Sequence, residues 1–247
     1  MALHIETTLT AQGDQPKAID LLVKSLSSKK KHHVLLGVTG SGKTFTIANV
    51  LARLNRSALI IAPNKTLAAQ LYAEFKQLFP KSPVGFFISY YDYYQPEAYV
   101  PSTDTYIAKD SSINDDIDKM RHETTRYLFE EKKAIIIASV SCIYGLGSPK
   151  AYAKQKVEIK TGQTVERDTL LKQLVGIQYK RNDYQLQRGS FRVQGDTVDI
   201  LPSHENERAI RIEFFGEDIE SITLIDSLTG KTISSLKEIH IYPNSHY

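Results

Sequence analysis

The run Gly37-Val38-Thr39-Gly40-Ser41-Gly42-Lys43-Thr44 matches the phosphate-binding template G-x-x-x-x-G-K-[ST]. Glycine at positions 40 and 42 lets the backbone bend so that successive N–H groups point into one concavity, and a helix starting near residue 43 adds its positive N-terminal dipole. An apolar stretch before the run and a helical pattern after it disfavour the alternative of a chance glycine-rich turn. The nucleotide site predicted here consists of Thr39, Gly40, Ser41, Gly42, Lys43 and Thr44.

Within this site the last two residues have the chemical roles. We expect Lys43 to reach the β- and γ-phosphates and Thr44 to ligate Mg²⁺, so both are candidate catalytic residues and Thr44 is the candidate metal ligand. Upstream, the amide of Gln15 can donate to and accept from an adenine edge at once, which favours ATP over GTP. The same segment also has the pattern of a helix start, with Asp14 as cap and Pro16 in the first turn, and the two interpretations are compatible.

A third candidate follows the apolar stretch 58–62. Lys65 stands where a strand ends and a helix begins, on the edge at which open α/β sheets bind ligands. With Asn64 and Thr66, it is a candidate contact to a phosphate of nucleic acid. The alternative is a solvated strand-to-helix turn with a capping residue.

Tyrosines are concentrated between residues 88 and 114, where six of the fourteen in the chain occur. Prolines and polar residues make this segment a poor core element, so we expect exposed rings that stack on unpaired bases. The alternative is a tyrosine-rich hairpin packed on its own domain. Nearby, Lys109, Arg121 and Arg126 either bind phosphates or pair with Glu97, Asp104 or Asp110. The candidate DNA-binding residues are Lys65, Tyr90, Tyr91, Tyr93, Tyr94, Tyr99 and Tyr106.

Alternating strand and helix patterns predict the elements that position these residues. Continuously apolar runs at 34–37, 58–62, 84–89 and 134–139 indicate strands of a parallel sheet, and apolar spacing at 43–54, 67–79 and 113–130 indicates covering helices. Leu67, Leu71, Phe75 and Leu78 form one apolar stripe that we assign to the core. The fold expected for residues 1–148 is therefore an α/β domain with a parallel sheet and a β-hairpin inserted at about 88–114.

After residue 148 the pattern changes to short alternating strands. Stretches 191–193 and 197–200 flank Gln194-Gly195-Asp196, a hairpin signature, and 210–214 alternates apolar and charged residues. Residues 149–247 are therefore predicted to form a smaller α+β domain. Arginines and acids alternating on short strands favour a polar docking surface, although a solvated sheet face has the same pattern.

Composition narrows the class of protein. The 247 residues are 41% hydrophobic and 24% charged, with a net charge of +3, which permits nucleic-acid contact without requiring it. The single cysteine, Cys142, excludes an internal disulfide and is expected to be a small core residue. Without a long apolar run or a signal-peptide pattern, we expect a cytoplasmic protein and no membrane partner. A P-loop ATPase needs an acid at the end of another strand to hold Mg²⁺, but the strand predicted at 134–139 ends in hydroxyl side chains.

Together these motifs resemble the UvrB family of the bacterial excinuclease ABC system for nucleotide-excision repair. The resemblance runs along the whole chain, and the tyrosine-rich run 90–101 is its most specific part. It implies a helicase-like P-loop ATPase that uses ATP and Mg²⁺ and a hairpin that clamps damaged double-stranded DNA, with Tyr93 and Tyr94 probing the damaged strand. It also implies that the second domain docks UvrA, through positions that match Arg181, Arg188, Arg192, Arg211 and Glu213.

The chain departs from the family pattern in two places. Gln194 stands where the family has a second arginine, so one docking contact is expected to differ. The family continues beyond residue 247 into a magnesium-binding acid, a second motor domain and a tail that contacts UvrC, so we expect an N-terminal part with little ATP hydrolysis of its own. Two other functions compete: a UvrA-binding module without ATPase activity, and a small-molecule kinase that shares only the P-loop.

Overall fold

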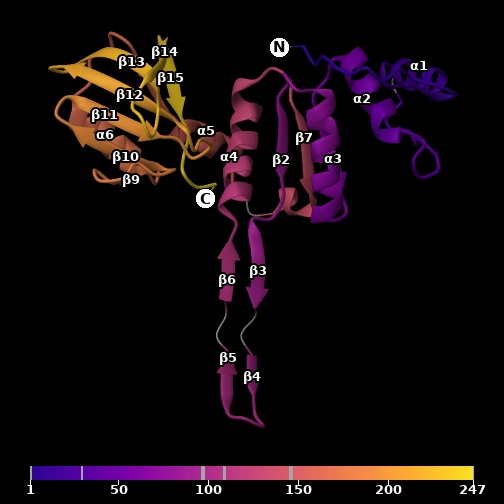
Figure 1. Ribbon diagram of the computed structural model, residues 1–247, viewed down its shortest axis with the longest axis horizontal. Coiled ribbons are helices and arrows are strands. Elements are labelled where there is room, and N and C mark those ends of the chain that lie inside the picture. Colours follow the sequence, from indigo (N-terminus) through magenta and orange to yellow (C-terminus); the bar gives the residue numbers. More distant parts are fainter. Residues whose placement is uncertain (1, 29, 96–97, 108–109, 145–146, 247) are drawn as a thin grey trace. The chain divides into compact units, whose positions relative to one another are not determined.

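The computed structural model describes residues 2–28, 30–95, 98–107, 110–144 and 147–246. It divides the chain into two compact units, Met1–Cys142 and Ile143–Tyr247, each shown with its elements in Figure 1. The sequence pattern places the boundary at 148/149, a few residues further along. Cys142, at this boundary, is half-buried.

The first unit is built on a three-stranded parallel sheet in the order β1-β7-β2. Its strands are β1 (Ala58–Ala62), β7 (Ile135–Ser139) and β2 (Val84–Phe87), close to three of the four predicted ranges. Figure 1 shows α3 (Lys65–Leu78) and α4 (Asp115–Glu130) on opposite sides of β2 and β7. Because helices cover both faces there, every residue of β7 and β2 is buried and the strands are continuously apolar.

Side-chain caps fix the starts of both covering helices. The Oδ1 of Asn64 accepts a hydrogen bond from the Leu67 N–H at 2.8 Å, and the Oδ1 of Asn114 accepts one from the Ile117 N–H at 3.0 Å. Three aspartates in the first turn of α4 also favour its N-terminal dipole. In the predicted stripe of α3, Phe75 and Leu78 are buried, whereas Leu67 in the capped first turn is 37% exposed.

The prediction of a strand at 34–37 is wrong. This segment has no regular secondary structure, and Val34 and Leu36 are 80% and 88% exposed. The reason is that an apolar run becomes a strand only beside a partner strand, and none pairs with it in the part of the chain that the structure describes. The helices on either side of the loop do form, as α1 (Gln15–Leu26) and α2 (Lys43–Leu54).

The tyrosine-rich insertion forms the predicted hairpin. Strand β3 (Tyr91–Gln95) pairs antiparallel with β6 (Asp110–Ile113), and β4 (Ala98–Val100) pairs with β5 (Thr105–Ile107). In Figure 1, β3 and β6 leave the end of the sheet at which β2 finishes. Glu97 and Lys109, considered above as partners or phosphate ligands, lie outside the described residues.

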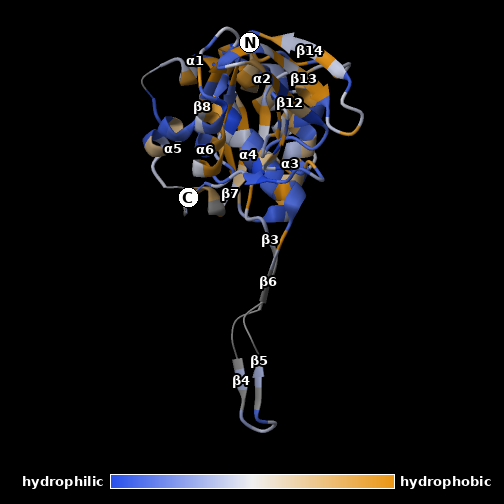
Figure 2. Ribbon diagram, turned by 90° about the vertical axis from the view of Figure 1, so that its left-hand side faces the viewer, coloured by the Kyte–Doolittle hydropathy of each residue, from blue (hydrophilic) through white to orange (hydrophobic). Residues whose placement is uncertain are grey.

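The second unit has a six-stranded sheet in the order β14-β13-β12-β11-β10-β9. Helix α6 packs on one face, where the buried Leu174, Phe191, Ile200 and Ile212 form the core. Figure 2 shows hydrophobic colour on β12 and β13, whereas α4 of the first unit is largely hydrophilic. The elements are η1 (Val140–Ile143), α5 (Pro149–Gln155), β8 (Val157–Lys160), α6 (Arg167–Gly176), β9 (Lys180–Arg181), β10 (Ser190–Gln194), β11 (Thr197–Leu201), β12 (Arg208–Phe215), β13 (Asp218–Asp226), β14 (Thr232–Leu236) and β15 (Glu238–Ile241).

Among the described residues, no helix has the length and apolarity needed to cross a membrane.

Candidate functional site

The phosphate loop is an exposed turn that leads directly into α2. Gly40 and Gly42 have φ of 82° and 73°, the left-handed region that favours glycine, and Gly42 is the N-cap of α2. A Cβ at Gly42 would also lie only 2.3 Å from the Gln15 side-chain nitrogen. Thr39, Gly40 and Ser41 are exposed, so the loop presents its backbone to solvent at a helix N-terminus, the arrangement that binds anions.

The ammonium group of Lys43 folds back over this loop. Its Nζ donates to the carbonyl oxygens of Gly37 and Val38, both at 2.8 Å. These acceptors are neutral, and Lys43 has no ion pair with a carboxylate in the described residues. The positive charge is therefore available to a phosphate that enters the loop.

Gln15 contacts the loop from α1. Its Nε2 donates to the Ser41 carbonyl oxygen at 3.0 Å, while its Oε1 accepts from the Gln12 N–H at 3.1 Å. The Nε2 bond thus links α1 to the loop, and the Oε1 bond stays within the segment that leads into α1. Asp14 occupies the N-cap position, but its side chain makes no capping hydrogen bond.

These residues fit the phosphates of ATP, because a concave backbone, a helix N-terminus and a lysine without a counter-ion meet at one place. Thr44, the second residue of α2, is half-buried beside them and could offer its hydroxyl to Mg²⁺. No group of three or more His, Cys, Asp or Glu suited to a metal occurs among the described residues.

Three donors fix the root of the tyrosine hairpin by bonding carbonyl oxygens close together in the chain. The Nη1 of Arg121 donates to the Ile88 oxygen at 2.6 Å, and the Asn114 N–H donates to the Tyr90 oxygen at 2.8 Å. The Nζ of Lys65 donates to the Tyr91 oxygen at 2.5 Å. Lys65 therefore joins the start of α3 to the hairpin, a contact that neither interpretation of the sequence included.

Arg121 is buried within the root. Its guanidinium carbon lies 4.0 Å from the centre of the Phe87 ring and 4.9 Å from that of Tyr90. Only 3% of the residue is exposed, so it supports the hairpin and does not face solvent. Arg126 instead pairs with Glu130 on the surface of α4, at 2.8 Å.

Tyrosines are exposed at two levels of the hairpin. At the root, Tyr90 is half-buried and Tyr91 is 42% exposed, with ring centres 4.6 Å apart. At the tip, Tyr99 and Tyr106 face each other across β4 and β5 and are 56% and 64% exposed. The hydroxyl of Tyr99 donates to Asp104. This hydrogen bond is the main reason why the pKa of the phenol is raised, and partial desolvation adds to it.

Tyr93 and Tyr94 lie in β3, opposite Ser112 and Ser111, and the structure describes their backbone only.

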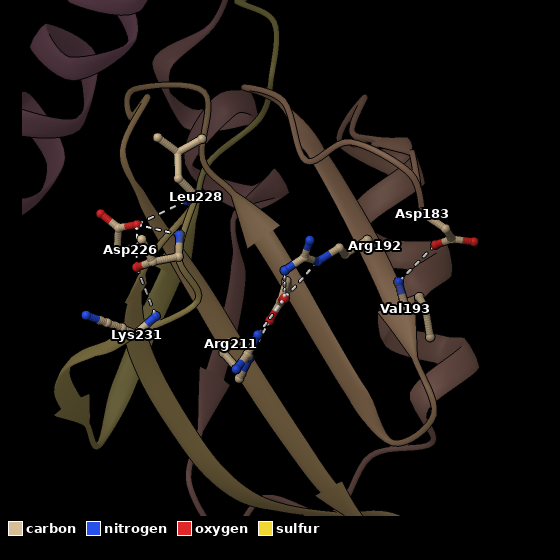
Figure 3. A network of polar contacts seen from close by, with 9 residues as sticks. Asp183, Arg192, Val193, Arg211, Asp226, Leu228 and Lys231 are labelled. Carbon is tan, nitrogen blue, oxygen red and sulfur yellow. Dashed lines mark hydrogen bonds and ion pairs between the residues drawn. The ribbon is translucent and has the colours of Figure 1, made fainter.

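On the second unit, two predicted docking residues share one buried acid. Strand pairing places Arg192, Asp199 and Arg211 in one row across β10, β11 and β12. The Nε and Nη2 of Arg192 donate to Asp199 Oδ2 at 2.9 and 2.8 Å, and those of Arg211 donate to Oδ1 and Oδ2 at 2.8 and 3.0 Å. Figure 3 shows the two guanidinium groups converging from β10 and β12, the strands on either side of β11.

The charges of this row determine the ionisation of Asp199. Its side chain is 2% exposed, and this burial by itself raises the carboxyl pKa. The hydrogen bonds and charges of Arg211 and Arg192 outweigh burial, so the pKa lies below its ordinary value of 3.8. Asp199 is therefore ionised at neutral pH.

The other predicted docking residues are divided between the two faces of the sheet. Glu213 lies beside the row and accepts from the Ser221 hydroxyl at 2.6 Å, while Gln194 is exposed opposite Thr197. Arg181 is in register with the core residue Phe191, hence on the face that α6 covers. There it pairs with Asp183 at 2.9 Å, beside an apolar hollow of about 320 Å³. Arg188 donates to the Ser203 carbonyl oxygen at 2.9 Å.

Asp199 was not among the predicted site residues. The signal was present, because a two-residue turn at Gly195-Asp196 pairs position 194 with 197 and so places Arg192 opposite Asp199.

Comparisons with known proteins agree with this architecture. Residues 8–139 match the family model described as "Type III restriction enzyme, res subunit", and residues 157–247 match the model described as "UvrB interaction domain". The chain is thus a helicase-like P-loop domain followed by an interaction domain.

Similarity to whole proteins gives the family. The chain is 58% identical to the UvrABC system protein B of Nitratidesulfovibrio vulgaris strain Miyazaki F over 98% of its residues, and 57% identical to that of Bacillus subtilis strain 168 over 96%. The chain belongs to the UvrB family. It spans 36% of the length of each of these two relatives.

The lowered pKa of Asp199 predicts an acid-dependent loss of stability. A group whose folded-state pKa is depressed stabilises the fold above its unfolded pKa, and that contribution is lost as pH falls through the folded value. At pH 7 we expect Asp199→Asn to lower the free energy of unfolding by about 1.5–3 kcal/mol, because charged hydrogen bonds are lost. The difference from wild type should shrink as pH falls below 3.8. Urea denaturation across this range measures it, and a difference that persists undiminished would contradict the assignment.

Proposed function

We propose that this chain carries the ATP-binding, DNA-contacting and UvrA-docking parts of a nucleotide-excision repair protein that verifies DNA damage. The hairpin is the observation that carries the proposal. It stands on a P-loop domain, its root is fixed by Arg121, Asn114 and Lys65, and Tyr99 and Tyr106 remain exposed at its tip. A core element would bury such rings, whereas exposed aromatic rings suit stacking on bases.

ATP binding, DNA contact and UvrA docking are each assigned to a different group of residues. The loop 37–44 takes the phosphates of ATP with Mg²⁺ at Thr44, and the tyrosines contact damaged double-stranded DNA. The row of Arg192, Asp199 and Arg211 faces UvrA. Because chromosomal DNA is the substrate, the proposal places the protein in the cytoplasm.

A binding module without ATPase activity is the second candidate. The observation that favours it is that the second unit has its own hydrophobic core. This core includes Phe191 and Ile212 and contains no residue of the P-loop. A steady ATP turnover by the 247-residue chain that Lys43→Ala abolishes would exclude this candidate.

Nucleotide binding depends on the charge of Lys43. Replacing it by alanine removes the only group of the loop able to pair with the β- and γ-phosphates, so we expect ATP affinity to fall about tenfold or more. Titration of the chain with a fluorescent ATP analogue and Mg²⁺ measures this. As a control, Lys24→Ala at the end of α1 should bind like wild type. Equal affinities for wild type and Lys43→Ala would refute the predicted phosphate site.

DNA contact depends on the hairpin rings. We expect the double variant Tyr99→Ala, Tyr106→Ala to weaken binding to damaged duplex by about 1–3 kcal/mol per stacked ring, without loss of ATP binding. The double variant Tyr93→Ala, Tyr94→Ala should reduce the preference for damaged over undamaged duplex. Tyr184→Ala, which removes a fully exposed ring of the second unit, is the matched control. Gel-shift assays that show unchanged affinity for the first variant and unchanged discrimination for the second would exclude the stacking role.

Docking can be tested by a gain of function at Gln194. This side chain is exposed next to the arginine row, so Gln194→Arg adds a positive charge without disturbing the core. We expect UvrA affinity to rise by about 0.2–1 kcal/mol, the value of an exposed ion pair. The control Gln173→Arg adds the same charge on α6, on the opposite face. Calorimetry that finds equal effects, or none, for the two variants would contradict docking through this face.

A further inference from the structure

We propose that Asp199 is a positioning residue for docking: it holds the guanidinium groups of Arg192 and Arg211 at a fixed spacing and orientation, as one two-pronged cation for a carboxylate-bearing partner surface. The inference rests on the docking function proposed above. It concerns how the arginines are presented, because Asp199 itself is shielded from any partner.

The geometry separates the two kinds of charge. Asp199 is 2% exposed in the middle of the row, whereas the side chains of Arg192 and Arg211 are 20% and 25% exposed. The negative charge therefore lies beneath, and the positive charges lie at the surface. With two cations and one anion, the row keeps one net positive charge that no described residue neutralises in a salt bridge.

Each guanidinium also keeps donors for a partner. Nε and Nη2 of both arginines are directed at Asp199, which leaves the two Nη1 groups without a hydrogen-bond partner among the described residues. Because both forks grip the same carboxylate, these remaining donors have a fixed separation. A partner carboxylate then meets donors that need no further ordering, which lowers the entropic cost of association.

Two considerations distinguish a positioning role of Asp199 from a purely structural one. A second arginine is unnecessary to satisfy one buried carboxylate, since a single fork already supplies two charged hydrogen bonds. If Asp199 acts by positioning, its removal should affect the association rate and the dissociation rate of the partner differently. The net positive charge of the face rises, which favours encounter with an acidic partner, while the orientation of the arginines is lost, which speeds dissociation.

The experiment measures association and dissociation rates of the full 247-residue chain with UvrA, at two salt concentrations. For Asp199→Asn we expect an unchanged or raised association rate and a dissociation rate at least about tenfold faster. Asp199→Glu keeps the charge and changes only the geometry, so its association rate should equal that of wild type while its dissociation rate also rises. Glu217→Gln, an exposed acid in the turn between β12 and β13, is the matched charge control and should leave dissociation unchanged.

A coupling measurement separates positioning from loss of fold. In the background Arg192→Lys, Arg211→Lys, where no fork remains to be oriented, Asp199→Asn should change dissociation less than about twofold. An equal effect in both backgrounds would overturn the inference, as would an unchanged dissociation rate for Asp199→Asn and Asp199→Glu with native circular dichroism. If the Asn variant does not fold, the Glu variant decides alone. Absence of binding by wild type would instead refute the proposed docking function, and this inference with it.

Discussion

The register between β10 and β11 is the constraint on which the proposed docking face depends. A two-residue turn at Gly195 and Asp196, with Gly195 at a φ of 59°, pairs residue 194 with residue 197. Arg192 is thereby placed opposite Asp199, and the next strand adds Arg211 to the same row. A slip of one residue would turn Asp199 into the apolar core and expose Ile200, so burial of the core and assembly of the charged row enforce the same pairing.

In the first unit, the corresponding constraint is that the backbone carbonyl groups at the root of the hairpin need hydrogen-bond donors. A hairpin that leaves a parallel sheet ends its own pairing at the point where the strands separate, and the freed acceptors require donors. Here α4 provides Arg121, the N-cap residue before α4 provides the Asn114 N–H, and α3 provides Lys65. Two side chains and one backbone N–H thus hold the root to the two helices that sandwich the sheet. The tip, in contrast, is held by its own strands and by the Tyr99–Asp104 hydrogen bond.

Sequence patterns were sufficient where local chemistry decides the structure. The continuous apolar runs located β1, β2 and β7, and the turn before α3 does contain a capping residue, Asn64. The strand predicted at 34–37 failed because pairing is a property of two segments, and apolarity reports only one of them. The burial of Arg121 was not predicted either: its charge suggested a phosphate ligand or an ion-pair partner, and aromatic rings and a carbonyl oxygen at the hairpin root make its burial favourable. Arg181 lies apart from the arginine row because of how β9 pairs with β10. A strand of two residues has no sequence pattern from which that pairing could be predicted.

The two cationic sites differ in a way that matches what each is proposed to bind. Lys43 carries a single charge on a flexible side chain, and its acceptors among the described residues are two neutral carbonyl oxygens. Such a group can move from these acceptors to a phosphate and back, as repeated binding and release of a nucleotide requires. Arg192 and Arg211 are planar forks fixed by four bonds to one carboxylate. They lose little freedom when a partner arrives, but they cannot follow a ligand that moves, so this arrangement favours a protein surface of defined geometry over a small anion.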